Sequence, residues 1–536
     1  MRAKGRLAFK AARAFGFGCA LMLSAGSGLA QEGAAPGAGP LSAIDWLSDS
    51  VSTPAAPQVG AGVGASASSG QEPAVSAGVS LSAVSVAPLI GGMSLDSLGL
   101  YRAAVTGLPK SLWGSSSAQT LAQRIRALPV DMLPALQALL YTMLLAELDP
   151  PQTGSDGATL FLARVDKLLE MGALDQADAL LSRAGNTDPQ VFRRRFDVAL
   201  LIGAEQPLCE IMAQTPDLSP TYQARIFCLA RAGDWSGAAL LMGTGSALGL
   251  IPEADADLFA RFLDPDLFEG EPPLPAPRLP TPLTFRMFEA IGEAIPTAAL
   301  PLAFANADLR DNIGWKARLE AGERLARSGA VSDNQLLGLY TERRPAASGG
   351  VWDRAAALQK LEANMAAGNR AGTAAALPSA WAGLAEARVE VPIARIHGPA
   401  LAAMGLEGDA GSIALRMGLL SEDYEAVALA AAPASAQDRL LVALAQGVAG
   451  GDAGMAARAG AVRDGFRATE PPARLAFLVQ NNRLGEAILR AMTLLTEGTE
   501  GDLDQVTDAL ALLRAVGLED VARRAALQFL ILERRG

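Results

Sequence analysis

The sequence is poor in the residues that most often build metal sites and nucleophilic sites. Its 536 residues include a single histidine, His397, and only three cysteines. A lone histidine excludes the HExxH zinc motif and multi-histidine metal sites, and no GxSxG segment is present to carry a nucleophilic serine. We therefore expect His397, in ARIHGPALAAM, to lie at a helix end without a catalytic role, and we expect no cofactor.

Positive charge and long apolar runs are also scarce. The chain carries 45 basic and 56 acidic residues, for a net charge of −11. Nucleic acid and anionic membrane surfaces both require clustered positive charge, so neither is an expected partner. The most apolar internal segment, LPALQALLYTMLLAEL (133–148), contains Gln137 and is too short to cross a bilayer comfortably. It predicts a buried core helix and no stable membrane insertion.

Aromatic residues make up 5% of the chain, and runs of β-branched residues are rare, whereas alanine and leucine dominate. Alanine and leucine are the strongest helix formers, and strands favour the residue types that are missing. The composition therefore predicts an all-α protein. A chain of this length exceeds what one hydrophobic core usually holds, so we expect two or more packed units.

The first thirty residues have the pattern of an export signal. A positively charged start is followed by the apolar run AFGFGCALMLSAGSGLA and by small residues at Gly28 and Ala30, where signal peptidase cleaves. Cys19 lacks the apolar residue three positions earlier that a lipid-anchored cysteine requires. Cleavage would change the net charge to −16 and release the protein into the periplasm or the medium. The five cations of this segment are Arg2, Lys4, Arg6, Lys10 and Arg13.

Residues 31–83 are rich in Gly, Ala, Ser and Pro and low in charge, which predicts a disordered tether. It contains one short amphipathic segment at 41–51, LSAIDWLSDSV, in which Ser42 and Asp45 have the spacing of a capping box. An amphipathic helix on a tether can dock in a groove of another protein, dock on this protein's own helices, or be an idle spacer. The docking residues would be Leu41, Ile44, Trp46, Leu47 and Val51.

The rest of the chain divides at EPPLPAPRLPTP (271–282), whose proline density predicts an extended, semi-rigid strut. We expect an N-terminal helical lobe at 84–270 and a C-terminal helical lobe at 283–536. The strut either separates the two lobes or lies along one continuous surface.

A helical repeat is visible in MGALDQADALLSRAGNTDP (171–189) and in CLARAGDWSGAALLM (228–242). Each has a glycine that ends one helix and a small residue in the next helix. Related joints recur in 480–489 and 516–527, and weaker versions occur in MGLLSEDYEAVAL and AAGNRAGTAAAL. These segments resemble the joints of tetratricopeptide repeats, which implies an α-solenoid of irregular helical hairpins. The joint residues are Gly172, Ala177, Gly233, Asp234, Trp235, Ala238, Gly517 and Ala522.

Two cysteines, Cys209 and Cys228, remain after signal cleavage, and an even count in an oxidising compartment favours pairing. The repeat resemblance places 205–214 and 220–232 on neighbouring helices, which strengthens this prediction. We expect a structural disulfide worth roughly 3 kcal/mol rather than a catalytic thiol.

A broader resemblance links blocks such as LSAIDWLS, TGLPKSLWG, FCLARAGDW and LRAVGLEDVARRAALQFL to secreted, alanine-rich bacterial proteins of unknown role. Some of those carry the label "antifreeze glycopeptide", but this chain lacks the flat, regular threonine array that an ice-binding face requires.

Three further patterns favour plain structural interpretations. GTGSALG (243–249) follows a helix and lacks dinucleotide-loop spacing, so it predicts a loop. The acidic run 253–271 has Phe259 where a calcium loop needs an oxygen ligand, so it predicts a solvated face. The six tryptophans are scattered, which predicts separate packing anchors rather than a sugar-binding cleft.

These observations favour an exported, non-enzymatic helical-repeat scaffold that binds an envelope protein or peptide. The alternatives are a cell-wall-acting glycosidase with a helical superhelix body, which would need two carboxylates in a cleft, and a passive structural or stress-related envelope protein.

Overall fold

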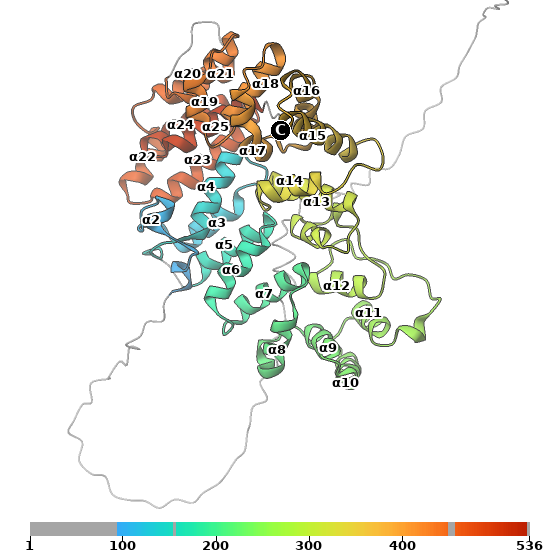
Figure 1. The fold of residues 1–536 in the computed structure, drawn as a ribbon. Coiled ribbons are helices and arrows are strands. Elements are labelled where there is room, and N and C mark those ends of the chain that lie inside the picture. The colour runs from blue at the N-terminus through green and yellow to red at the C-terminus, as the bar shows by residue number, and fades with distance from the viewer. Residues whose placement is uncertain (1–93, 154–156, 449–455, 533–536) are drawn as a thin grey trace, which may run out of the picture. The chain divides into compact units, whose positions relative to one another are not determined.

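The computed structural model describes residues 94–153, 157–448 and 456–532. The predicted signal peptide, tether and docking segment 41–51 therefore lie outside the described residues. The described chain is built almost entirely from helices, which confirms the all-α prediction (Figure 1). Among these helices none is long and apolar enough to cross a membrane.

The helices before the proline-rich segment are η1 (Leu95–Ser97), α2 (Ala103–Thr106), α3 (Ala118–Ala127), α4 (Pro134–Leu145), α5 (Thr159–Glu170), α6 (Leu174–Ala184), α7 (Pro189–Ile202), α8 (Gln206–Gln214), η2 (Pro216–Leu218), α9 (Tyr222–Arg231), α10 (Trp235–Ala247), α11 (Glu253–Leu263) and η3 (Pro265–Phe268).

Those after it are α12 (Pro282–Ala290), η4 (Thr297–Ala299), η5 (Leu302–Leu309), α13 (Trp315–Arg327), α14 (Asp333–Thr341), α15 (Val351–Ala366), α16 (Arg370–Ala387), α17 (Glu390–Ala403), α18 (Gly408–Leu419), α19 (Tyr424–Ala430), α20 (Ala436–Ala445), α21 (Ala457–Arg467), α22 (Ala473–Gln480), α23 (Leu484–Thr499), α24 (Leu503–Ala515) and α25 (Glu519–Ile531).

Two short parallel strands, β1 (Tyr101–Arg102) and β2 (Ala146–Glu147), pair beside the end of α4. Arg164 of α5 is fully buried here and donates to the carbonyl oxygens of Leu144 and Ala146 at 2.8 and 3.0 Å. Burial lowers the pKa of Arg164 to about 10, so the side chain stays a cation at neutral pH. It satisfies carbonyl groups that the last turn of α4 leaves without helical partners.

Most helices pack against the helix that follows them in the chain, as α5 does with α6, α8 with α9, and α23 with α24. Local caps set these boundaries. Asp188 accepts hydrogen bonds from Gln190 and Val191 at the start of α7, and Thr221 accepts one from Ala224 at the start of α9. Such side chains satisfy amides that the first helical turn leaves free, so α7 and α9 begin at defined residues.

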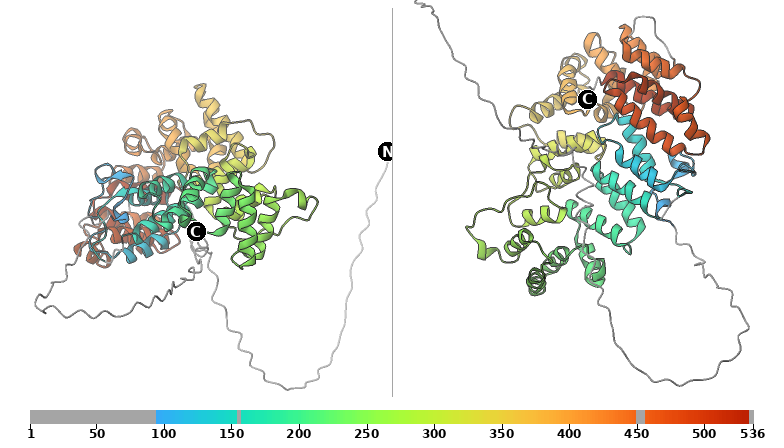
Figure 2. Two further views of the ribbon diagram at one scale, coloured as in Figure 1. Left: turned by 90° about the horizontal axis from the view of Figure 1, so that it is seen from below. Right: turned by 180° about the vertical axis from the view of Figure 1, so that it is seen from behind.

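Helices from the beginning of the described chain also pack against helices from its end. Figures 1 and 2 show α3 and α4 beside α23 and α25, and these pairs are in contact. The Oε1 atom of Gln528 accepts a hydrogen bond from the amide of Ala135 at 2.8 Å. A Cβ on Gly485 would lie 2.7 Å from the ring of Trp113, so this position requires glycine. These contacts join helices that are far apart in the sequence, in addition to the packing of each helix against the next one in the chain.

Residues on both sides of the proline-rich segment share one hydrophobic core. Gly172 takes φ 75°, and a Cβ there would lie 2.6 Å from Leu325. Asn306 donates to the carbonyl of Gly172, and Ser328 donates to that of Met171, at 2.9 and 2.7 Å. The segment 271–281 forms neither helix nor strand and is mostly exposed, and Pro282 is already the first residue of α12.

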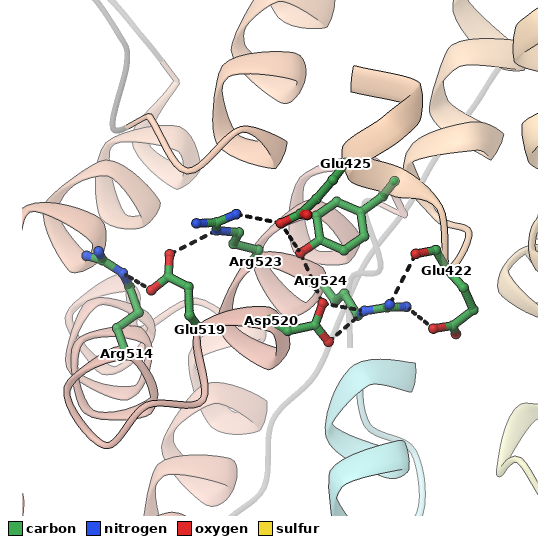
Figure 3. Close-up of polar contacts among 8 residues, drawn as sticks. Glu422, Glu425, Arg514, Glu519, Asp520, Arg523 and Arg524 are labelled. Atoms are coloured by element: carbon green, nitrogen blue, oxygen red, sulfur yellow. Dashed lines mark hydrogen bonds and ion pairs between the residues drawn. The ribbon is translucent and has the colours of Figure 1, made fainter. Parts of the chain in front are cut away.

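A charged network joins the start of α19 to α24 and α25 (Figure 3). The hydroxyl of Tyr424 donates to Asp520 at 3.0 Å, and burial together with this carboxylate raises the pKa of Tyr424. Arg524 bridges Asp520 and Glu422, at 2.9 and 2.7 Å. Arginine forks of this kind hold two elements in a fixed register. The network contains Glu422, Tyr424, Glu425, Arg514, Glu519, Asp520, Arg523 and Arg524.

Candidate binding site

The predicted disulfide is present. Cys209 of α8 and Cys228 of α9 are bonded, with their Cα atoms 5.1 Å apart. Both side chains are buried, and the bond joins two adjacent helices at positions 19 apart in the sequence. The cysteines therefore hold α8 against α9 and are not available as nucleophiles.

The segment after Cys228 forms the turn between α9 and α10. Gly233 takes φ 85° where α9 ends, and the Asp234 side chain accepts a hydrogen bond from the amide of Gly237 at 2.9 Å. Ala238 is fully buried. Trp235, by contrast, is 50% exposed, and its ring lies 6.0 Å from that of Phe262 in α11. This turn fixes the direction in which α10 leaves the hairpin.

The other residues named from the repeat pattern lie at separate turns and do not form one site. Gly172 lies between α5 and α6, and Gly517, with φ 86°, lies between α24 and α25. Ala177 and Ala522 are fully buried in the helices that follow these glycines. The docking residues Leu41, Ile44, Trp46, Leu47 and Val51 are outside the described residues.

Helix α10 is apolar but largely exposed. Its thirteen residues, WSGAALLMGTGSA, contain no charged side chain, and only Ala238 and Gly245 are buried. Leu240 is 73% exposed, and Leu248, the residue that ends the helix, is 67% exposed. Exposed apolar surfaces of this kind mark interaction sites in soluble proteins.

Next to α10 lies a polar pocket of about 450 Å³, which we call the arginine pocket. It is built where α9, α11 and α12 meet the ends of α8 and η5. Glu205 directly precedes α8, and Arg310 directly follows η5. Phe262 belongs both to this pocket and to the ring pair with Trp235. The lining residues are Glu205, Phe227, Arg231, Phe262, Arg286, Glu289, Ala290, Arg310 and Asn312.

The charged residues of the arginine pocket alternate in sign. Arg231 and Arg286 approach Oε1 of Glu205 at 3.5 and 3.4 Å. Arg286 and Arg310 both donate to Glu289. Burial by itself would raise the pKa of Glu289, but the hydrogen bonds from Arg310 and Arg286 outweigh it and lower that pKa. Glu289 is therefore a carboxylate at neutral pH, and its role in the pocket is to hold two guanidinium groups in place.

Two buried polar atoms of the arginine pocket have no hydrogen-bond partner in the described part of the chain. Within the described part of the chain, Oε2 of Glu205 and Nε of Arg286 are buried without a partner. The Glu205 side chain is only 2% exposed, whereas that of Arg231 is 49% exposed. Buried polar atoms are rarely left unpaired in proteins. The pocket is therefore chemically suited to a ligand that brings both a donor and an acceptor.

A second pocket, of about 210 Å³, lies between α7, α9, α11 and α12. It is lined by Arg193 and Asp197 of α7, whose charged atoms lie 3.9 Å apart. Burial raises the pKa of Asp197 to about 7, although Arg193 and Arg194 act in the opposite direction. Asp197 therefore changes its charge near neutral pH.

Several predictions from single segments need correction. His397 lies within α17 rather than at its end, with Nε2 3.2 Å from Glu362. In GTGSALG, residues 243–247 form the last turns of α10, because helical bonding to the previous turn continues through both glycines. Trp315 and Trp352 are not separate anchors, since their ring centroids lie 5.0 Å apart.

The acidic run 253–271 forms α11 and η3 and includes buried Leu258 and Phe259. In the described ranges, no group of three or more His, Cys, Asp or Glu side chains is arranged to hold a metal ion.

Sequence reasoning missed the arginine pocket. Glu205 and Arg231 lie in segments that the repeat pattern placed on helices, but their charged partners Arg286, Glu289 and Arg310 lie about 55 to 105 residues further along the chain than these two residues. The one signal in the sequence that could have pointed to such a pocket is that arginine is far more common than lysine in this chain. The comparisons give no further guidance, because no family model, no curated protein and no solved structure matches the chain.

Proposed function

We propose that this protein is an exported, non-enzymatic scaffold of irregular tetratricopeptide-like helical hairpins that binds a protein or peptide partner in the cell envelope. The disulfide between Cys209 and Cys228 supports export, because such bonds persist in oxidising compartments. The hairpin joints support the repeat assignment, since a positive-φ glycine and a buried alanine recur at 172–177, 233–238 and 517–522.

The observation that carries the proposal is the exposure of α10. Each Å² of apolar surface left in water forgoes roughly 25 cal/mol of burial free energy, so an uncharged helix at the surface is costly unless something covers it. Trp235 lies at the start of this helix, and Arg231 lies one turn before it at the end of α9. Tryptophan and arginine are the residue types most enriched in binding hot spots. The docking surface therefore consists of α10 and the arginine pocket.

The arginine pocket also contains two carboxylates, which is what the alternative glycosidase function would require. A glycosidase needs one carboxyl group to stay protonated as the general acid, with a raised pKa. The pKa of Glu289 is lowered instead, and Glu205 and Glu289 share Arg286 as an ion-pair partner. This arrangement favours binding over glycoside hydrolysis.

The segment 41–51 provides a second contact in this proposal. Its spacing of Leu41, Ile44, Leu47 and Val51 is that of a helix that docks through one apolar face. A scaffold that binds one partner through two linked contacts gains affinity through effective concentration.

Affinity capture from the envelope fraction tests this function. The exported protein is compared with a Leu240→Glu variant, which places a charge on the α10 surface, and with Val105→Glu as the control. Val105 is 75% exposed and Leu240 is 73% exposed, so both variants should fold equally well. We expect a discrete partner that is captured by the wild type and by Val105→Glu and is lost with Leu240→Glu. Identical capture by all three proteins would overturn the proposed docking surface.

A further inference from the structure

We propose that the arginine pocket binds a carboxylate of the partner peptide, while apolar side chains of the same peptide lie against Trp235 and Phe262. This inference rests on the proposed binding function and names the chemistry of the partner. The carboxylate belongs either to an acidic side chain or to the C-terminus of the peptide.

The charge of the pocket favours an anionic ligand. Its lining includes three arginines and two glutamates, so the pocket is positive within a chain whose net charge is −11. The side chains of Arg286 and Arg310 are 19% exposed and both pair with Glu289, whereas that of Arg231 is 49% exposed. Guanidinium groups bind carboxylates through paired N–H donors, and Arg231 has donors that face the solvent.

The unpaired atoms distinguish a peptide from a bare anion. Among the described residues, Nε of Arg286 lacks an acceptor and Oε2 of Glu205 lacks a donor. A carboxylate can accept from the arginines, and the amide N–H next to it can donate to Glu205. Inorganic phosphate carries a higher negative charge than a carboxylate at neutral pH, so the buried carboxylate of Glu205 repels phosphate more strongly.

An apolar wall continues from the pocket toward α10. The rings of Phe227 and Phe262 are stacked with centroids 6.1 Å apart, and the centroid of the Trp235 ring lies 6.0 Å from that of Phe262. Phe262 therefore connects the charged pocket with the exposed start of α10. A peptide that places an apolar residue beside its carboxylate matches both parts of this surface.

Binding of three matched peptides to the full exported protein tests this inference. The probes are acetyl-Leu-Ala-Glu-Leu-amide, its Gln analogue acetyl-Leu-Ala-Gln-Leu-amide, and the Gln analogue with a free C-terminal carboxylate. Isothermal titration calorimetry gives the affinities, and inorganic phosphate serves as a competitor. We expect one of the two acidic peptides to bind at least about tenfold more tightly than the neutral one, because a charged hydrogen bond is worth about 1.5–3 kcal/mol. Which acidic peptide binds identifies the source of the carboxylate.

Matched variants localise the effect. Arg231→Ala should abolish the preference for the acidic peptide, and Arg231→Lys should restore part of it. Arg343→Ala should retain the preference in full, because Arg343 is 67% exposed and lies outside the pocket. Equal affinity for all three peptides, no binding of any of them, full competition by phosphate, or an unchanged preference in Arg231→Ala would each overturn the inference. If Leu240→Glu still abolishes partner capture in that case, the proposed function stands and only the carboxylate assignment fails.

Discussion

Helices α4 and α10 are alike in being apolar and uncharged, but they differ in how much of their surface is buried. Both are uncharged and apolar, with the sequences PALQALLYTMLL and WSGAALLMGTGSA. Eight of the twelve residues of α4 are buried, whereas only two of the thirteen residues of α10 are. Helix α4 packs against its chain neighbour α5 and against α25 from the far end of the described chain, whereas α10 packs against its chain neighbours α9 and α11. An apolar composition therefore makes burial of a helix favourable, but whether the helix is buried depends on which other helices pack against it.

The largest expected effect comes from truncating a leucine in α4. Leu140 is fully buried, so Leu140→Ala removes apolar contacts and leaves a cavity. We expect the free energy of unfolding to fall by about 3–4 kcal/mol. Urea denaturation with the wild type as reference measures this. A loss below about 1 kcal/mol would mean that α4 is packed no better than α10.

The next effect concerns the disulfide that supports the exposed region. Replacing both Cys209 and Cys228 by serine removes the link between α8 and α9, and we expect a loss of about 3 kcal/mol or somewhat less. Because these helices carry Glu205 and Arg231, the double variant should also weaken binding at the arginine pocket. Thermal unfolding with and without reductant measures the stability. A wild type that is unaffected by full reduction would contradict this role.

A smaller effect should depend on pH and is confined to the pocket beside α7. The pKa of Asp197 is about 7 in the folded protein and about 3.9 in an unfolded chain, so the folded state binds more protons between these values. Stability contributed by the protonated group is therefore lost as pH rises from about 4 to about 7. Asp197→Asn should lack this loss. Urea denaturation at pH 4.5 and 7.5 gives the free energies of unfolding of both proteins. Relative to the wild type, the variant should be more stable at pH 7.5 than it is at pH 4.5. A constant difference would contradict the raised pKa.

The smallest expected effect completes the comparison. Leu240→Ala in α10 truncates a side chain that is already 73% exposed, so we expect stability to change by less than about 0.5 kcal/mol. The same urea measurement as for Leu140→Ala applies. A loss comparable with that of Leu140→Ala would show that α10 is covered in solution by another part of the protein.

The sequence predicted those features that depend on short segments. The composition predicted the all-α class, and the apolar segment 133–148 predicted the buried helix α4. The even number of cysteines predicted the bond between Cys209 and Cys228. The arginine pocket could not be predicted, because it requires Glu205 and Arg310 to meet across many intervening helices. The exposure of α10 could not be predicted either, because an uncharged apolar segment is expected to be buried. The pairing of Trp315 with Trp352 depends on tertiary packing in the same way.

Photo-crosslinking from α10 tests the central claim most directly. A photoreactive side chain is placed at Leu240, and the control carries it at Val105, which is equally exposed. Irradiation of intact cells should give a discrete crosslinked adduct from position 240 and none from position 105. Arg231→Glu should remove that adduct if the arginine pocket belongs to the same docking surface. Absence of any adduct at position 240 beyond that at position 105 would contradict the claim that α10 is a docking surface.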